Sequence, residues 1–424
     1  MKVQADLLLT DIGELVTMAG SPGLRRGEAA NDLSIISDGA LASFNGRIVW
    51  TGKALNASDN VELLDNSLEI DVAGKVITPG FVDSHTHPLY AGTRQVEFAM
   101  RAGGADYEDI AAAGGGILNS VSRTRHASSA DLEDTLVKHL TTMLLYGTTT
   151  VEVKSGYGLD FETEIRCLEA ASRLSEYWPQ TIARTFLGAH EVPLEYRNRP
   201  NEYIRYLIDE VLPEIKSREL ADFVDIFCEK GVFTAEQSRL YLQAAKDMGF
   251  GVRMHADEFH NTDGASVAVD AGALSADHLL SISDSNIRKI AQSNTVATLL
   301  PGTALFLGKP FPPGRKLLDA GAAVAIATDF NPGSCFCESM PLMINLAVCK
   351  CGFTIEEAVT AATVNGAAAL GMDDYKGALV PGMDADMILW DLDDYRGIAY
   401  HMAIPDIEDV VVAGQLVSSM FEQY

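Results

Sequence analysis

The hydrophobic pattern of the chain differs between its two ends and its middle. Residues 1 to about 75 form short alternating or β-rich runs that Gly, Asn and Asp interrupt, and the C-terminal stretch has the same texture. Short strands separated by such turn residues are typical of all-β structure. The expected strands are Ala5–Leu9, Leu41–Thr51 and Leu68–Val72 near the start, and Asp386–Trp390, Glu408–Val412 and Gln415–Val417 near the end.

The middle of the chain alternates between two kinds of segment. Apolar runs of strand length are followed, in most cases, by segments with helical periodicity. The expected strands are Val76–Asp83, Thr149–Val153, Thr181–Leu187, Phe223–Phe227, Gly251–His255, Ser275–His278, Thr295–Leu299 and Ala323–Thr328, and helices are expected at Ala130–Tyr146, Glu162–Tyr177, Asn201–Ile215 and Ala235–Met248. Continuous apolar runs indicate parallel strands that are buried on both faces. This series of βα units predicts a TIM (β/α)8 barrel, with a doubly wound open sheet as the alternative.

Composition and charge narrow the choice of partner. Hydrophobic residues make up 47% of the 424 residues, which is ample for a large core, and 32 Lys+Arg against 59 Asp+Glu give a formal charge of −27. Such a charge disfavours nucleic acid and anionic membranes, because both are bound through Lys and Arg. Asp6 and Asp11 interrupt the start where a signal peptide would be apolar, and the six cysteines are scattered. We therefore expect a reduced, soluble, cytoplasmic protein that acts on a small molecule.

Histidines and acids gather at the predicted strand ends. His85 and His87 end the first strand, and because residues i and i+2 of an extended segment point the same way, both imidazoles can bind one metal ion. The fifth strand runs into His255 and Glu258, the sixth ends in Asp277 and His278, and the eighth is followed by Asp329. Five of the nine histidines fall at strand ends in this way: His85, His87, His190, His255 and His278.

Three imidazoles and a carboxylate suit Zn²⁺ or Fe²⁺ and leave a position for water. Metal binding can lower the pKa of that water from about 15.7 to about 7, which provides a nucleophile at neutral pH. The carboxyl ends of barrel strands share one rim, where the active sites of such barrels lie. The pattern therefore predicts a metal-dependent hydrolase.

The residues around this constellation resemble the amidohydrolase superfamily. Pro79-Gly80-Phe81-Val82-Asp83-Ser84-His85-Thr86-His87 is similar to its entry motif. Further similar blocks are Ala91-Gly92-Thr93-Arg94, Ala113-Gly114-Gly115-Gly116-Ile117, Val153-Lys154-Ser155-Gly156-Tyr157-Gly158, Gly188-Ala189-His190, His255-Ala256-Asp257-Glu258 and Ala327-Thr328-Asp329-Phe330-Asn331-Pro332-Gly333-Ser334. The resemblance implies an α/β fold with a barrel at residues 76–374 and a small β-sandwich domain that residues 1–75 and 375–424 form together.

The resemblance also implies a site and a reaction. The implied metal ligands are His85, His87, His255 and Asp329, which would hold one Zn²⁺ or Fe²⁺/Fe³⁺ per subunit. The implied substrate contacts are Arg94, Tyr157, His190, Glu258, Asn331, Gly333 and Ser334, with Tyr107 nearby. The closer resemblance is to the branch that acts in histidine degradation. It implies hydrolysis of the ring amide of 4-imidazolone-5-propanoate to N-formimidoyl-L-glutamate by a homodimer.

Each implied role has a chemical reason. Arg94 offers a planar fork for the propionate, and Tyr157 can bind the same carboxylate. His190 can bind a ring oxygen or stabilise charge on it, while Glu258 can reach a ring nitrogen and carry protons. His278 is a candidate base near the water. Which of Glu258, His278 and Asp329 is the general base and which the acid stays open.

Other interpretations remain. A purine, pyrimidine or triazine deaminase would use the same barrel, and a non-catalytic metal-binding protein would share its fold. Lys230 with Glu229 could hold a second metal ion, although the resemblance is to the single-metal type. Two CxC pairs could form a zinc site, but we favour free thiols because C-x₂₋₄-C is the usual spacing; the cysteines are Cys335, Cys337, Cys349 and Cys351.

Overall fold

The computed structural model describes residues 2–20, 23–105, 109 and 114–421, and its larger sheet is the predicted barrel. The strands, all parallel to their neighbours, are β6 (Phe81–Asp83), β7 (Thr148–Lys154), β8 (Thr181–Ala189), β9 (Phe223–Cys228), β10 (Gly251–Ala256), β11 (Ser275–His278), β12 (Val296–Leu299) and β13 (Val324–Ile326). The first and last strands meet just beyond their ends. There the N–H of Asp329 donates to the carbonyl of His85 at 3.0 Å, and that of His87 donates to Phe330 at 2.8 Å. The barrel is confirmed and the open sheet was the wrong alternative.

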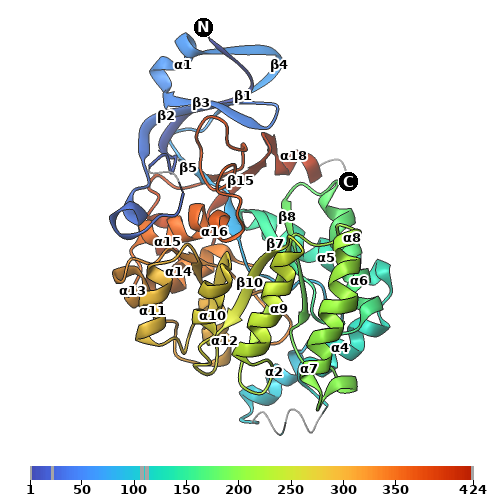
Figure 1. Ribbon diagram of the computed structural model, residues 1–424. Helices are drawn as coiled ribbons and strands as arrows, with labels where there is room; N and C mark the ends of the chain where they lie inside the picture. The colour runs from blue at the N-terminus through green and yellow to red at the C-terminus, as the bar shows by residue number, and fades with distance from the viewer. Residues whose placement is uncertain (1, 21–22, 106–108, 110–113, 422–424) are drawn as a thin grey trace.

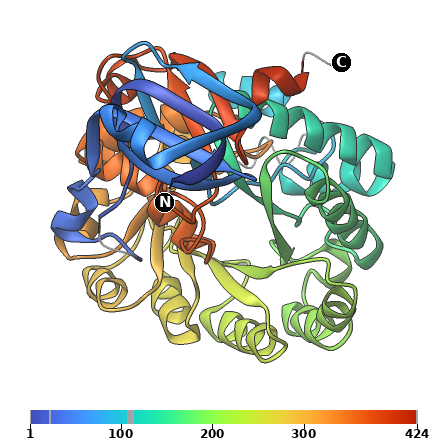
Figure 2. The ribbon, with the colours of Figure 1, turned by 90° about the horizontal axis from the view of Figure 1, so that it is seen from above.

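The described helices surround the barrel (Figure 2), except the first and the last, which contact strands of the smaller sheet. They are α1 (Ala57–Asn60), α2 (Gln95–Ala102), α4 (Ile117–His126), α5 (Ser129–Leu145), α6 (Phe161–Ser175), α7 (Pro200–Tyr206), α8 (Leu212–Ser217), α9 (Ala235–Asp247), α10 (Gly264–Ala271), α11 (Asp284–Ala291), α12 (Pro301–Leu307), α13 (Gly314–Asp319), α14 (Met340–Cys351), α15 (Ile355–Ala362), α16 (Val364–Ala369), α17 (Gly397–Tyr400) and α18 (Val417–Phe421). Ser128 and Thr234 begin α5 and α9 with capping boxes, which satisfy the free N–H groups of the first turn.

One predicted helix is divided. The segment 201–215 forms α7, a π-helical turn at Leu207–Val211, and then α8. Pro213 has no N–H with which to continue an i→i−4 ladder, so the regular helix is interrupted one turn before it.

The smaller sheet is mixed and combines both chain ends. Its strands are β1 (Val3–Val16), β2 (Ile35–Phe44), β3 (Arg47–Lys53), β4 (Val61–Asp71), β5 (Val76–Pro79), β14 (Met387–Trp390), β15 (Ile407–Val412) and β16 (Gln415–Leu416). Figure 1 shows it as a lobe at the end of the barrel away from α2 and α12. The expected strand 41–51 is in fact a hairpin, because Asn45 and Gly46 both have positive φ, 49° and 75°, and form a two-residue turn.

The predicted first barrel strand is divided at Gly80. Residues 76–79 form β5, which lies between β1 and β14 in the terminal sheet, and the barrel strand begins at Phe81. A Cβ at position 80 would lie 2.2 Å from Thr149 Oγ1, so only glycine fits where the chain passes from one sheet to the other. The boundary between the two units at residues 75 and 76 stays a prediction, and this pairing places residues 76–79 with the terminal strands.

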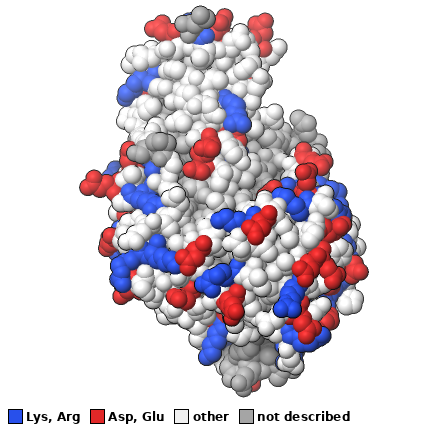
Figure 3. Space-filling view, viewed as in Figure 1, with Lys and Arg blue, Asp and Glu red and all other residues white. Residues whose placement is uncertain are grey.

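The surface carries charges of both signs (Figure 3), and the cysteines form no disulfide bond among the described residues. Figure 3 shows acidic and basic side chains interspersed over the barrel helices on one face of the molecule. Among the described residues, all six cysteines are free. Within the same part of the chain, no helix has both the length and the apolar character needed to cross a bilayer.

Candidate metal centre and active site

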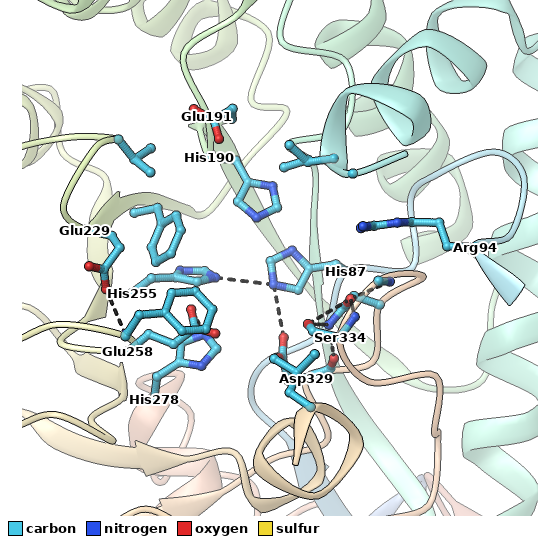
Figure 4. Close-up of a pocket in the computed structure, with 18 of the residues that line it drawn as sticks. His87, Arg94, His190, Glu191, Glu229, His255, Glu258, His278, Asp329 and Ser334 are labelled. Atoms are coloured by element: carbon cyan, nitrogen blue, oxygen red, sulfur yellow. Dashed lines mark hydrogen bonds and ion pairs between the residues drawn. The ribbon is translucent and has the colours of Figure 1, made fainter. Parts of the chain in front are cut away.

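A cavity of about 780 Å³ opens at the carboxyl ends of the barrel strands. Figure 4 shows its polar side chains facing one another from several strands. Of the residues that the sequence singled out, it is lined by His87, Arg94, Tyr157, His190, His255, Glu258, His278, Asp329, Asn331, Gly333 and Ser334. His85 is fully buried below them. The structure thus brings the predicted set together, while Tyr107 lies outside the described residues.

Four ligand-type atoms cluster at the floor of this cavity. His87 Nε2 lies 3.1 Å from His85 Nε2 and 3.4 Å from His255 Nε2. Asp329 Oδ1 lies 3.5 Å from His85 Nε2 and 3.4 Å from His87 Nε2. Ligands about 2.1 Å from a tetrahedral ion stand about 3.4 Å apart, so the separations fit a metal site. His278 also approaches, in a group with His85 and Asp329.

Carboxylates outside the cavity orient the two innermost imidazoles. Asp277 Oδ2 accepts from His85 Nδ1 at 2.8 Å, and Asp225 Oδ2 lies 2.9 Å from His255 Nδ1. A ring whose Nδ1 proton is held this way presents the unprotonated Nε2 to a metal ion. Burial also lowers the pKa of His85 well below its ordinary value, which keeps that ring neutral. The donor set and its orientation therefore fit a metal ion.

A buried ion network supports these carboxylates from below. Lys154 Nζ lies 2.7 Å from Asp225 and 2.9 Å from Glu152, and Arg253 lies 3.0 Å from Glu152 and 3.3 Å from Asp277. All five side chains are fully buried, so each charge depends on its partners. The network is a feature that sequence reasoning missed. Its signal was the charged pair Glu152 and Lys154 on one face of a strand with no other charged residue.

The backbone is strained at three residues where the barrel strands end. Asp257, His278 and Asp329 are non-glycine residues with φ of 50°, 77° and 51°, each at the carboxyl end of a barrel strand. Such conformations cost about 1–3 kcal/mol each and cluster at functional sites. At Asp257 the carboxylate accepts the backbone N–H groups of three residues in the following loop, Thr262, Gly264 and Ala265, which offsets the strain.

The acidic side of the cavity holds a carboxyl group poised to carry a proton. Burial raises the pKa of Glu258 well above its ordinary value, and the charges of Asp329 and Glu229 add to the effect. Its Oε2 lies 3.6 Å from His278 Nε2. Burial lowers the pKa of His278 to about 3. The two shifts favour the protonated form of the Glu258 carboxyl and the neutral form of the His278 imidazole.

Glu229, which the sequence offered as a bridging ligand, has a different set of contacts. Its Oε2 accepts from the N–H of Phe259 at 2.9 Å and its Oε1 accepts from His260 Nδ1 at 2.9 Å. The carboxylate therefore anchors the residues that follow Glu258. Lys230 lines the cavity but is exposed. Among the described His, Cys, Asp and Glu residues, Glu229 belongs to no group of three ligand-type atoms.

The loop after β13 is built around the side chain of Asn331. Its Oδ1 accepts from the N–H groups of Gly333 at 2.8 Å and Ser334 at 2.7 Å, and its Nδ2 donates to the carbonyl of Asp329 at 2.7 Å. We expected the Asn331 amide and the Gly333 N–H to face the substrate. Both groups make these contacts within the loop while the two residues line the cavity, so Asn331 shapes the loop and the expected substrate contacts stay a prediction.

His190 and Tyr157 close the cavity opposite the ligands. His190 Nδ1 donates to the carbonyl of Gly156 at 3.0 Å, and its ring stacks on His87 with centroids 5.2 Å apart. Burial lowers the pKa of His190 well below its ordinary value, so the ring is neutral and its Nε2 is a hydrogen-bond acceptor. The loop that carries Tyr157 is held by Glu164, whose Oε1 accepts the N–H groups of Gly156, Gly158 and Leu159.

Known proteins are similar to this chain in sequence or in fold. The chain matches the amidohydrolase family over residues 76–417. Imidazolonepropionases of Bacillus cereus strains AH187 and B4264 are 45% and 46% identical to it over 419 residues, 99% of this chain and 98% of each relative. A zinc-bound adenosine deaminase from Xanthomonas campestris has a TM-score of 0.70 at 17% identity, with 98% of this chain and 93% of that one covered. E. coli guanine deaminase has a TM-score of 0.71 at 18% identity, with 97% of this chain and 98% of that one covered. At such identity the two structures show the common fold alone, whereas the full-length relatives show the family: the chain belongs to the amidohydrolases and, among them, to the imidazolonepropionases.

Proposed function

We propose that the protein hydrolyses the ring amide of 4-imidazolone-5-propanoate to N-formimidoyl-L-glutamate. The observation that carries the proposal is the opposed polarity of the cavity. Figure 4 shows Glu258 and His278 on one side of the ligand cluster and Arg94 on the other. A substrate with a hydrolysable ring at one end and a carboxylate at the other fits between them. The names of the full-length relatives support the same substrate.

Substrate binding follows from the two sides of the cavity. The propionate lies toward the Arg94 guanidinium, with the Tyr157 hydroxyl nearby, and the ring lies over the histidines. His190 was expected to stabilise the oxyanion, but a neutral ring whose Nδ1 proton is given to Gly156 has no proton at Nε2. The geometry favours a different role, in which His190 Nε2 accepts a ring N–H of the substrate.

Proton transfer is assigned to Glu258 and His278. As the oxygen of water adds to the ring carbonyl carbon, neutral His278 takes a proton from it. The C–N bond then breaks, and protonated Glu258 gives its proton to the departing nitrogen. The 3.6 Å between His278 Nε2 and Glu258 Oε2 lets the proton return to Glu258 and complete the cycle.

We propose one zinc or iron ion per subunit, held by His85, His87, His255 and Asp329. When bound, such an ion lowers the pKa of water to about 7 and polarises a carbonyl oxygen. His255→Ala should abolish activity and lower the metal content of the purified protein. Full activity of protein shown by elemental analysis to be free of metal would overturn the assignment.

The decisive assay follows the loss of ultraviolet absorbance of imidazolone propionate made in situ, with metal analysis of the same sample. We expect loss of absorbance and formation of N-formimidoyl-L-glutamate, identified by mass spectrometry. No loss in metal-loaded protein, together with ammonia release from guanine, cytosine or a triazine, would show a deaminase instead. No turnover of any of these would favour a binding protein.

We also propose that the protein is a homodimer, from the sequence resemblance, and that it is cytoplasmic, from the scattered cysteines. A homodimer should sediment at about twice the 45.6 kDa chain mass. Cytoplasmic location should appear as exclusive recovery in the cytoplasmic fraction of the source cells.

A further inference from the structure

The positive charge of Arg94 is already balanced within the protein. Its Nε and Nη2 both donate to Glu97 Oε2, at 2.8 and 2.6 Å. Glu97 is buried and also accepts from the N–H of Gly116 at 3.1 Å. Although burial alone would raise the pKa of Glu97, the hydrogen bond from Arg94 holds it below its ordinary value. The Arg94–Glu97 pair therefore carries no net charge with which to attract a substrate carboxylate.

A second guanidinium lines the same cavity. Arg94 is the residue that precedes α2, and Glu97 and Arg101 lie three and seven residues after it, on one face of this helix. Arg101 is partly buried; its Nη2 donates to the carbonyl of Gly333 at 3.4 Å, and its guanidinium stands 5.4 Å from the ring centroid of Phe306. Its buried Nε has no hydrogen-bond partner. Among the described residues no carboxylate forms an ion pair with Arg101, although the charge of Glu97, which is paired with Arg94, also acts on it.

The two arginines converge on one glycine. A Cβ at position 333 would lie 2.1 Å from Arg94 Nη1, and the carbonyl of the same residue accepts from Arg101. Both arginines and Gly333 also line a smaller cavity of about 270 Å³ beside the first, together with Phe98, Phe306, Pro332 and Phe336.

We propose that Arg101 is the specificity-determining residue for the substrate carboxylate, because it supplies the net positive charge that the Arg94–Glu97 pair lacks. Arg94 then contributes hydrogen-bond donors and Arg101 contributes the uncompensated charge. The inference rests on the proposed function for the identity of the substrate. The chemistry that it requires is a ligand with one carboxylate a few bonds from a five-membered ring.

The test compares two ligands of similar size, one with a carboxylate and one with an uncharged amide in its place. Imidazole-4-propionate and its uncharged primary amide are titrated calorimetrically into metal-loaded wild type and into Arg101→Gln. We expect the substitution to weaken binding of the propionate about tenfold or more, because an uncompensated charge is lost, and to leave binding of the amide unchanged. Equal weakening of both ligands would show that Arg101 merely holds the Gly333 loop, and an unchanged affinity for the propionate would also overturn the proposal.

A second variant tests the charge balance. Glu97→Gln in the Arg101→Gln background releases the charge of Arg94 and keeps an acceptor for the N–H of Gly116. It should restore part of the preference for the propionate over the amide. No restoration would contradict the assignment of net charge. Arg288→Gln, the same substitution at an exposed position on α11, is the matched control and should change neither affinity.

The outcome can be separated from that of the proposed function. Because calorimetry needs no turnover, a wild type that prefers the propionate but does not hydrolyse imidazolone propionate would refute the reaction and leave the role of Arg101 standing. If the wild type hydrolyses the substrate and the Arg101→Gln variant has the same kcat/KM as the wild type, the role of Arg101 alone is refuted.

Discussion

Asp277 accepts a hydrogen bond from Nδ1 of His85 at 2.8 Å, with both side chains fully buried below the cavity. Arg253 Nη2 lies 3.3 Å from the same carboxylate oxygen. Asp277 thus holds the proton on Nδ1 of His85, and the ion pair with Arg253 holds Asp277 in place. The ligand atoms owe their arrangement to residues that no substrate touches.

Replacing this acceptor should weaken metal binding. In Asp277→Asn a neutral amide faces His85, and Arg253 loses part of its compensating charge. We expect the metal affinity to fall about 10–100-fold, as for other changes to residues that orient ligands. Competition with a chromogenic chelator measures it. Asp270→Asn on α10 is the surface control, and an affinity equal to wild type in Asp277→Asn would disprove the orienting role.

Removing the proton of Glu258 should slow the chemical step. Glu258→Gln keeps the size and an amide N–H but cannot deliver a proton to the departing nitrogen. We expect kcat to fall about 10²–10⁴-fold with little change in KM, the range for general acid catalysis. Steady-state kinetics with metal content checked for each preparation measures it. A rise in KM with kcat unchanged would assign Glu258 to binding instead.

Glu164 should prove important to stability although it lies outside the cavity. Its Oε1 accepts three backbone N–H groups of the loop that carries Tyr157. Glu164→Ala leaves them buried without a partner, at a cost of about 1–3 kcal/mol for each unsatisfied group. Urea unfolding should show a lower midpoint for Glu164→Ala. Glu164→Gln, which keeps an acceptor, should lose much less; equal losses would point to packing rather than hydrogen bonding.

Asp83 should make the fold sensitive to pH. It accepts from the N–H of Thr328 at 3.0 Å and from its hydroxyl at 2.7 Å, and burial raises its pKa to about 7. Between an unfolded pKa of about 3.8 and the folded value, the folded state holds more protons than the unfolded state. This contribution to stability is therefore complete below the unfolded pKa and is lost as pH rises through about 7.

The measurement is the free energy of unfolding between pH 5 and pH 8 for wild type and Asp83→Asn. The wild type should lose stability relative to the variant as pH rises, by at most about 1.4 kcal/mol per pH unit. Parallel curves would show that Asp83 does not titrate in this range.

The fold and the rim of the site could be predicted because both depend on patterns visible along the chain. These are the spacing of apolar residues and the position of polar residues at the ends of the predicted strands. Continuous apolar runs identified the parallel strands. Because the carboxyl ends of such strands share one rim, His87, His255 and Asp329 could be placed together before any coordinates were known. The boundaries depended on local details that the pattern did not contain, such as the close contact of Gly80 with Thr149.

The buried network could not be predicted in the same way. Glu152, Arg253 and Asp277 lie on three different strands, and their meeting depends on strand order and register. Likewise, the spacing of Arg94 and Glu97 was visible, but only the helix shows that they neutralise each other. A hydrogen-bond partner that lies far away in the sequence decides whether a polar residue is free to bind substrate.

The passage of the chain through Gly80 has a consequence for the order of assembly. β5 lies between β1 and β14, and its last residue is separated from the barrel strand by Gly80 alone. During synthesis from the N-terminus, the neighbour β1 is made before β5. The other neighbour, β14, is complete only once residue 390 has been added. Barrel closure between His85 and Asp329 also waits for late residues. Contacts so distant along the chain form slowly, so the nascent protein should stay incapable of binding metal tightly until nearly all of it has emerged.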